Sequence, residues 1–211
     1  LVSGDTQTVT ETVQILQPDT LTVKKDEINL IDKYVGYRLE NTDPETIPNM
    51  ISNGSTIKVY YIKDSFDYTV EYYYDGNIDT EKTETIEATY QDVISTYTDK
   101  NITGYRLDKV EGTPLTITEN EGTNVIKVYY VKDNFDYTVE YYYDETIDDS
   151  KTEVITATFA DIIDGYTDKN ITGYRLDRTE NVPLTITENE GTNVIKVFYV
   201  KDNFDYTVEY Y

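Results

Sequence analysis

Two consecutive stretches of this chain are near copies of each other. Segments 67–135 and 136–204 are both 69 residues long, and 53 of the 69 aligned positions are identical. The nine letters DYTVEYYYD open both copies, and DYTVEYY appears once more at 205–211. Self-similarity at a fixed period is typical of an array in which each repeat is one structural unit. We therefore expect several similar domains in this chain, not one large core.

The similarity also extends backwards from the two near copies. Gly36-Tyr37-Arg38-Leu39 matches the same four letters that begin at Gly104 and Gly173. In this divergent first copy, Thr8–Leu16 takes the place of the YYYDG strand. Because the last copy is cut short, we interpret the chain as an excerpt of a longer protein. The predicted organisation is a divergent repeat at 1–66 (repeat one), full repeats at 67–135 (repeat two) and 136–204 (repeat three), and at 205–211 the first strand of a truncated fourth repeat.

Each full repeat begins with the pattern of a β-hairpin. In repeat two, residues 68–74 alternate at period two, and residues 83–89 form a second strand after a polar loop. The inward positions of the first strand are Tyr68, Val70, Tyr72 and Tyr74. The last strand of the repeat has Ile126, Val128 and Tyr130 at its inward positions.

The period then changes to that of a helix. Tyr90, Val93, Ile94 and Tyr97 occupy positions i, i+3, i+4 and i+7, and Thr89 with Asp92 resembles an N-terminal capping box. Three further strands follow. The predicted fold class is α+β: tandem β-grasp-like (ββαβββ) domains, each a mixed sheet with one short helix, arranged as an extended rod.

The junction between repeats is short. It reads VKDNFDYT at 131–138 and IKDSFDYT at 62–69, with no Gly- or Pro-rich spacer. One phenylalanine recurs in it, as Phe66, Phe135 and Phe204. This inter-domain phenylalanine either caps the core of its own domain or wedges between two domains and fixes their angle. Both interpretations give a semi-rigid row of domains.

Composition excludes several functions. The formal charge of -23 repels nucleic acid and anionic lipid. No stretch approaches the eighteen or so apolar residues of a membrane span, so we expect no membrane insertion. Histidine and cysteine are absent, which removes the common nucleophile and base arrangements. We expect that the protein is not an enzyme and has no cofactor.

One loop has the spacing of a calcium ligand set. Asp75, Asn77 and Asp79 alternate as in the opening of a calcium-binding loop, but the glycine is misplaced for an EF-hand and position twelve is Ile86. A Ca²⁺ site and a solvated hairpin loop are therefore the two alternatives, and the loop is the simpler one.

Four aromatic residues fall on the sheet face opposite the predicted core. They are candidates for ligand binding, because exposed rings stack on sugars or on another protein. The simpler alternative is cross-strand pairing of the rings, which stiffens the sheet. The four residues are Tyr73, Tyr129, Tyr142 and Phe198.

Three segments of the repeat have a family resemblance. YTVEYYYDG at 68–76, GYRL at 104–107 and NVIKVYYV at 124–131 resemble the MucBP-type (mucin-binding-protein-like) tandem repeats of Gram-positive bacterial surface proteins. The resemblance implies a β-grasp-like domain, an extracellular location on a cell-wall-attached protein and, in some members, binding to mucin. Gly76 of this pattern is replaced by Glu145 in repeat three.

The sequence therefore favours a structural role. We expect stalk or spacer repeats of a bacterial cell-surface adhesin that project a distal binding region. The alternative is a module that binds mucin or another host glycoprotein through the exposed tyrosines. We expect a monomer, with strand exchange through 205–211 as the alternative.

Overall fold

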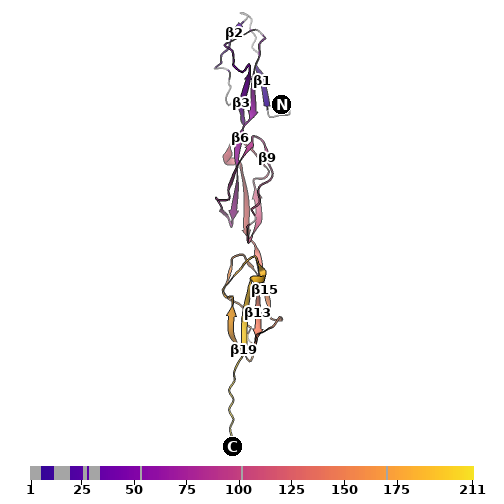
Figure 1. Ribbon diagram of the computed structural model, residues 1–211, viewed down its shortest axis with the longest axis vertical. Helices are drawn as coiled ribbons and strands as arrows, with labels where there is room; N and C mark the ends of the chain where they lie inside the picture. The colour runs from indigo at the N-terminus through magenta and orange to yellow at the C-terminus, as the bar shows by residue number, and fades with distance from the viewer. Residues whose placement is uncertain are drawn as a thin grey trace. The chain divides into compact units, whose positions relative to one another are not determined.

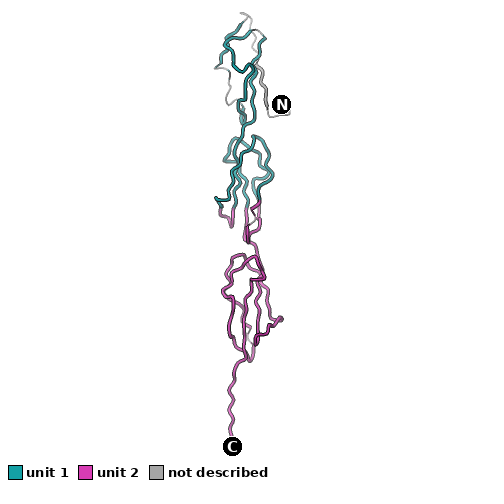
Figure 2. Tube along the Cα trace, viewed as in Figure 1, with its two compact units in different colours: residues 1–72, 78–98, 110–128 teal, residues 73–77, 99–109, 129–211 magenta. Residues whose placement is uncertain are grey.

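The computed structural model describes residues 6–11, 20–25, 28, 34–52, 54–100, 102–169 and 171–211. The chain divides into two compact units, which Figure 2 shows in different colours. Unit 1 comprises 1–72, 78–98 and 110–128, and unit 2 comprises 73–77, 99–109 and 129–211. Repeat two contributes segments to both units, so repeat three, which lies entirely in unit 2, gives the clearest view of one repeat.

The described residues form β-strands, and the predicted α+β class is wrong. Figure 1 shows strands joined by loops and turns. In the part of the chain that the structure describes, the only helical turns are two three-residue 3₁₀ turns, η1 (Glu121–Thr123) and η2 (Glu190–Thr192). Neither turn lies in the segment where the apolar stripe predicted a helix, so the predicted β-grasp-like domain with one helix is also not observed.

The predicted helix is interrupted at its second residue. Gln91 has a φ of 64°, as has Ala160 at the same place in repeat three, and a residue in this left-handed region does not continue a right-handed helix. Two residues later the chain forms the short strand β9 (Val93–Ile94), which pairs with β11 (Leu115–Thr116). Val93 is 61% exposed and is not a core residue.

The predicted capping contact does form, but it closes a turn. The Thr89 amide donates to the Asp92 carboxylate at 3.3 Å, and the Asp92 amide donates to the Thr89 carbonyl at 2.9 Å. The Ile117 amide then donates to the Asp92 carbonyl at 2.9 Å. The backbone groups that a helix would pair within itself are thus paired with another segment of unit 1.

Repeat three folds around two parallel strands in unit 2. β13 (Asn134–Tyr143) and β19 (Val194–Lys201) pair in parallel, from Thr138 opposite Val194 to Tyr143 opposite Tyr199. Figure 1 shows β13, β15 and β19 side by side. The other members pair antiparallel: β14 (Thr146–Ile147) and β15 (Glu153–Thr158) with β13, and β17 (Tyr174–Glu180) with β19. A separate two-stranded sheet contains β16 (Ile162–Ile163) and β18 (Leu184–Thr185).

The core of repeat three lies on one face of this sheet. Period-two alternation turns Val139 and Tyr141 of β13 and Ile195 and Val197 of β19 to the same side, where each is at most 1% exposed. Burial of each such side chain contributes about 1.5–3 kcal/mol. The cluster also contains Tyr137, Leu184, Ile186 and Tyr199.

The tyrosines of this core hold a loop through their hydroxyls. The Tyr141 hydroxyl donates to the Thr167 carbonyl at 2.6 Å and lies 3.2 Å from a Glu153 carboxylate oxygen. The Tyr199 hydroxyl donates to the Asp168 carboxylate and accepts from the Lys169 amide at 3.1 Å. The rings therefore supply apolar area while their polar ends anchor the loop between β16 and β17. In repeat two, the hydroxyls of Tyr72 and Tyr130 make the same contacts, to Thr98 and Asp99.

Repeat two has the same strand order. Its sheet runs β10-β12-β6-β7, with β8 on β6. The predicted hairpin is confirmed by the pairing of β6 with β8. Of the four predicted inward positions of β6, Tyr68, Val70 and Tyr72 are confirmed because they are at most 8% exposed, and Tyr74 is half-buried. The strands are β6 (Ser65–Tyr74), β7 (Asn77–Ile78), β8 (Glu84–Thr89), β10 (Tyr105–Glu111) and β12 (Val125–Lys132).

Repeat one, in unit 1, differs in the direction of its first strand. β1 (Thr6–Glu11) runs antiparallel to β5 (Ile57–Lys63), which also pairs with β3 (Tyr37–Asp43). The expected strand at Thr8–Leu16 thus begins earlier, and residues 12–16 lie outside the described residues. A second small sheet pairs β2 (Thr20–Thr22) with β4 (Met50–Ser52).

Candidate functional site

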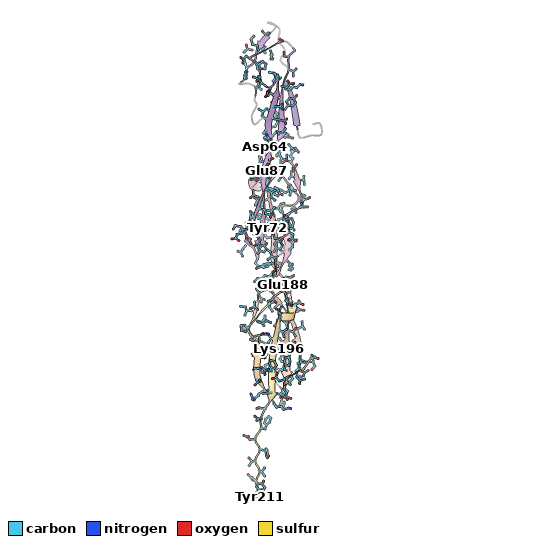
Figure 3. All side chains as sticks on the ribbon, viewed as in Figure 1. Asp64, Tyr72, Glu87, Glu188, Lys196 and Tyr211 are labelled. Atoms are coloured by element: carbon cyan, nitrogen blue, oxygen red, sulfur yellow. The ribbon has the colours of Figure 1, made fainter. Side chains whose placement is uncertain are left out.

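One aspartate joins the last strand of repeat one to the first strand of repeat two. β5 ends at Lys63 and β6 begins at Ser65, so the joint is Asp64 (labelled in Figure 3). Its amide donates to the Gly36 carbonyl at 2.8 Å, and its carbonyl accepts from the Tyr90 amide at 2.8 Å. Both partners lie in unit 1, one in each repeat. Asp64 therefore hydrogen-bonds to the two repeats that it connects.

The side chain of this aspartate is engaged as well. Its Oδ1 accepts the Ser65 amide at 3.0 Å and lies 3.3 Å from Nε of Arg38. This ion pair is exposed and contributes at most about 1 kcal/mol. Its effect is to fix the orientation of the carboxylate, because the hydrogen bond and the ion pair use the same oxygen.

The joint between repeats two and three has the same contacts inside unit 2. The Asp133 amide donates to the Gly104 carbonyl at 2.9 Å, and the Phe159 amide donates to the Asp133 carbonyl at 2.8 Å. The Asp133 carboxylate accepts the Asn134 amide at 2.9 Å and lies 3.4 Å from Nε of Arg106. Two independent copies of one arrangement indicate that the joint is encoded by the repeat.

An aromatic ring closes each joint. The Tyr90 ring lies against Gly36 so closely that a Cβ on the glycine would be 2.3 Å from ring carbon Cδ1, and Phe159 lies against Gly104 with the same 2.3 Å value. Both glycines have positive φ, 75° and 76°. Glycine is required at these positions for its backbone conformation and for the close approach of the ring.

The recurrent phenylalanines lie beside these rings. Phe66 meets Tyr90 edge-on with 6.1 Å between ring centroids, and Phe135 meets Phe159 at 6.2 Å. Phe135 lies in β13, the first strand of repeat three, and also packs against the core of that repeat. Phe204 is 75% exposed. Phe66 and Phe135 thus contact the repeat whose first strand contains them, β6 or β13, which is the repeat after the predicted boundary. With the boundary placed before these strands, the contacts favour the interpretation in which the phenylalanine caps its own domain, since the ring that reaches the preceding repeat is Tyr90 or Phe159.

Sequence reasoning missed the residues that make the joint. It placed Tyr90 in a helix stripe and used Gly36 only as a repeat marker. The available signal was that two short segments are shared by all three copies. KD is followed by SF or NF in each copy, and GYR recurs in each copy. The third copy of the motif shows the same first contact, because the Asp202 amide donates to the Gly173 carbonyl at 2.8 Å.

The four predicted ligand-binding aromatics form two cross-strand stacks. Tyr73 stacks on Tyr129 with 4.8 Å between centroids, and Tyr142 stacks on Phe198 with 4.6 Å. Phe198 is only 6% exposed. The stacks match the alternative interpretation, in which the rings pair with each other to stiffen the sheet.

Cations of the chain itself cover these stacks. Lys109 Nζ lies 4.6 Å from the Tyr129 centroid, and the Arg178 guanidinium carbon lies 3.8 Å from the Phe198 centroid. Both Arg178 NH groups donate to Glu145, at 2.9 and 3.1 Å. In repeat three, therefore, a held cation occupies the ring face that a sugar would use.

A carboxylate also restrains Tyr142. Its hydroxyl donates to Glu140 at 2.7 Å. This hydrogen bond, followed by desolvation, raises the pKa of Tyr142 to about 12. The hydroxyl is therefore a donor that is already engaged within the strand.

The proposed calcium ligands also have partners within the chain. Asp75 accepts from the Tyr105 hydroxyl at 3.0 Å, and the Asn77 amide group donates to the Asp75 carbonyl at 3.3 Å. Asp79 pairs with Lys82, whose hydrogen bond lowers the pKa of that carboxyl. These contacts favour the hairpin-loop alternative.

The described residues hold neither a candidate metal site nor a membrane-spanning helix. They contain no group of three or more acidic, histidine or cysteine side chains placed to hold a metal ion. They also contain no helix long and apolar enough to cross a membrane.

Comparison with known proteins gives no assignment. The chain matches no protein-family model and no curated protein sequence. The fold and the joint by themselves define the class as a tandem array of all-β repeats.

Proposed function

We propose that these repeats are spacer domains of a bacterial cell-surface adhesin and hold a distal binding region away from the cell. The joint is the observation that carries this proposal. A single aspartate links consecutive strands, and its amide and carbonyl bond to both repeats at 2.8–2.9 Å in both joints. A flexible tether contains more residues and no such contacts. A joint of this kind suits a protein whose function depends on the distance between its ends.

A distance measurement across the second joint tests the proposal. The chain has no cysteine, so Glu87→Cys with Glu188→Cys places spin labels at two exposed positions, one in each of repeats two and three (labelled in Figure 3). We expect a narrow distance distribution in the otherwise unchanged chain. Adding Gly104→Val should broaden it, because the new side chain collides with Phe159. A broad distribution without Gly104→Val would contradict the proposal.

Glycoprotein binding through the exposed tyrosines is the alternative function. It has less support, because Arg178 covers Phe198 and the aromatic rings stack on each other. A mucin pull-down separates the two functions. The spacer proposal expects no binding above that of a Tyr73→Ala, Tyr142→Ala variant. Binding that this variant abolishes would favour the module.

The spacer proposal also takes the chain to be a monomer. Residues 205–211 follow β19 without strand pairing, and Tyr206 and Tyr210 are 85% and 93% exposed. Their sequence is identical to 136–142 of β13, so pairing with a second copy is the alternative. Sedimentation of the chain beside a variant that ends at Phe204 compares the two, and equal monomeric values would refute strand exchange.

A further inference from the structure

The first and last strands of a repeat are its points of attachment to the array. In repeat three these strands are β13 and β19, which lie side by side at the centre of the sheet (Figure 1). Their register runs in parallel, from Thr138 opposite Val194 to Tyr143 opposite Tyr199. The start of β13 and the end of β19 are therefore at opposite ends of the strand pair.

This arrangement determines how a pulling force acts on the repeat. Tension enters at the start of β13 and leaves at the end of β19, so it slides the strands past each other and loads all of their hydrogen bonds together. The pair has six residue matches, and two further backbone bonds extend it: Thr138 N to Asn193 O at 2.8 Å and Asp144 N to Tyr199 O at 3.0 Å.

Side-chain contacts lie along the same line of force. The fully buried Asn193 amide donates to the Asp136 carbonyl at 3.3 Å, and the Glu190 carboxylate accepts the Asp136 amide at 3.1 Å. Both contacts join the start of β13 to the turn before β19. Sliding of the strands breaks these bonds together with the backbone ladder.

Repeat two has the same geometry. The Thr69 amide donates to the Asn124 carbonyl at 2.8 Å, and the Asp75 amide donates to the Tyr130 carbonyl at 3.1 Å. Each of these bonds matches one in repeat three, Thr138 to Asn193 and Asp144 to Tyr199. The buried Asn124 again donates to the Asp67 carbonyl, at 3.2 Å.

Repeat one is loaded differently. β1 is antiparallel to β5, with Thr6 opposite Ile62 and Glu11 opposite Ile57. Tension that enters before Thr6 and leaves after Lys63 acts at one end of the strand pair. It peels the pair apart one hydrogen-bonded match at a time, which needs less force than breaking all of them together.

We propose that repeats two and three are load-bearing elements that resist tension through shear of their parallel terminal strands, whereas repeat one opens first by unzipping. The inference rests on the spacer function, since a stalk between a cell and its target carries tension. It assigns mechanical strength to two repeats and extensibility to the first one.

Single-molecule stretching of the full chain by its ends tests this proposal. From the start of its first strand to the end of its last strand, repeat one runs over 6–63 (58 residues), and repeats two and three run over 65–132 and 134–201 (68 residues each). At about 3.5 Å per residue these lengths give roughly 200 Å and 240 Å when fully extended. We expect one low-force event with the shorter length gain, then two high-force events with the longer one.

A change of pulling direction provides the matched control. Asp149 and Asn203 are exposed. Asp149 follows β14, which is paired with Tyr142 and Tyr143 at the end of β13, and Asn203 follows β19, whose Tyr199 lies opposite Tyr143, so both handles act near the same end of the β13–β19 pair. Handles on Asp149→Cys and Asn203→Cys therefore unzip repeat three from one end. This geometry should open the repeat at lower force than the end-to-end geometry, with a length gain of about 190 Å for the 55 residues 149–203.

The outcomes separate this inference from the spacer proposal. Equal forces for all three repeats, or equal forces in the two pulling directions, would overturn the mechanical inference while a narrow spin-label distance still supported the spacer. A broad spin-label distance with unequal forces would contradict the spacer proposal and leave the difference in mechanical strength supported.

Discussion

The ring of Phe159 lies against the backbone of Gly104, where a Cβ would come within 2.3 Å of ring carbon Cδ1. Gly104 belongs to repeat two and Phe159 to repeat three, and both lie in unit 2. The main chain follows the same path, because Gly104 accepts from Asp133 and Phe159 donates to Asp133. Gly104 therefore leaves room for the Phe159 ring at the same point where its carbonyl accepts the hydrogen bond from Asp133.

Replacing Gly104 with alanine should lower the free energy of unfolding more than replacing its counterpart Gly173 with alanine. Both have positive φ, 76° and 84°, so alanine is strained at each, by about 1–2 kcal/mol. Only at Gly104 does the new Cβ also meet a ring, since nothing lies within 4 Å at Gly173. We expect Gly104→Ala, but not Gly173→Ala, to speed hydrogen exchange of the Phe159 amide.

A double variant identifies the cause. Phe159→Ala removes the ring that the new Cβ would meet. The double variant should therefore lose less free energy of unfolding than the sum of the losses in the two single variants. Additive costs would show that the glycine is needed for its φ alone and that the ring contact has no energetic role.

Asn193 should be essential to repeat three. Its side chain is fully buried, and it bonds to the Thr187 amide at 3.0 Å, the Thr187 carbonyl at 2.7 Å and the Asp136 carbonyl at 3.3 Å. Asn193→Ala removes the partner of these part-buried backbone groups and should destabilise the repeat by about 1–3 kcal/mol. Hydrogen exchange of β13 and β19 measures this loss within one repeat.

The exposed Asn189 is the matched control. In the structure it is the Asn189 main-chain carbonyl that accepts from Thr187 and Thr192, and this carbonyl remains in Asn189→Ala. We expect a change within about 0.5 kcal/mol. If Asn193→Ala were equally mild, the buried amide would not be a structural element.

High pH should unfold the repeats through their core tyrosines. Burial, followed by neighbouring carboxylates, raises the pKa of Tyr141 and Tyr199 above the usual value of about 10. The folded state therefore holds these protons more tightly than the unfolded chain does. This stability is fully present below about pH 10 and is lost as the pH rises further.

Phenolate absorbance and circular dichroism, recorded together during an alkaline titration, check this prediction. We expect a late absorbance phase that coincides with the loss of β-structure. Tyr141→Phe should reduce the amplitude of that phase. A titration complete near pH 10 with the sheet signal intact would show that these hydroxyls reach solvent in the folded state.

Glu145 carries strain that an ion pair offsets. Its φ of 65° lies in the left-handed region, where repeat two has Gly76, and its carboxylate holds Arg178 over Phe198. Glu145→Ala loses the pair and keeps the strain, whereas Glu145→Gly loses the pair and relieves the strain. We expect the glycine variant to be more stable than the alanine variant by about 0.4–1 kcal/mol in denaturant titrations. Equal stability would mean that this turn is not strained.

The sequence was a sufficient guide where one short-range pattern decides the structure. Alternation along 68–74 predicted which side chains of β6 are buried, because side chains of a strand point to opposite faces in turn. The hairpin with 83–89 followed from two such patterns and a polar loop. The cross-strand aromatic stacks were one of two alternatives already open at that level.

The helix prediction failed because apolar residues at helical spacing can also arise in a turn and a short strand that pack against other parts of the fold. Tyr90, Val93, Ile94 and Tyr97 have helical spacing, but Asp92, Ser95 and Thr96 between them are weak helix formers. Pairing with β11 and the contact of Tyr90 with Gly36 give these backbone and side-chain groups partners that no local pattern contains.

The sequence by itself determined the repeat, the hairpin of β6 with β8 and the buried face of β6. Only the tertiary structure decided which strands pair in parallel and which residues form the joint. The physical reason is range. Alternation acts between neighbours in the chain, whereas the pairing of β13 with β19 and the contact of Gly104 with Phe159 join groups more than fifty residues apart.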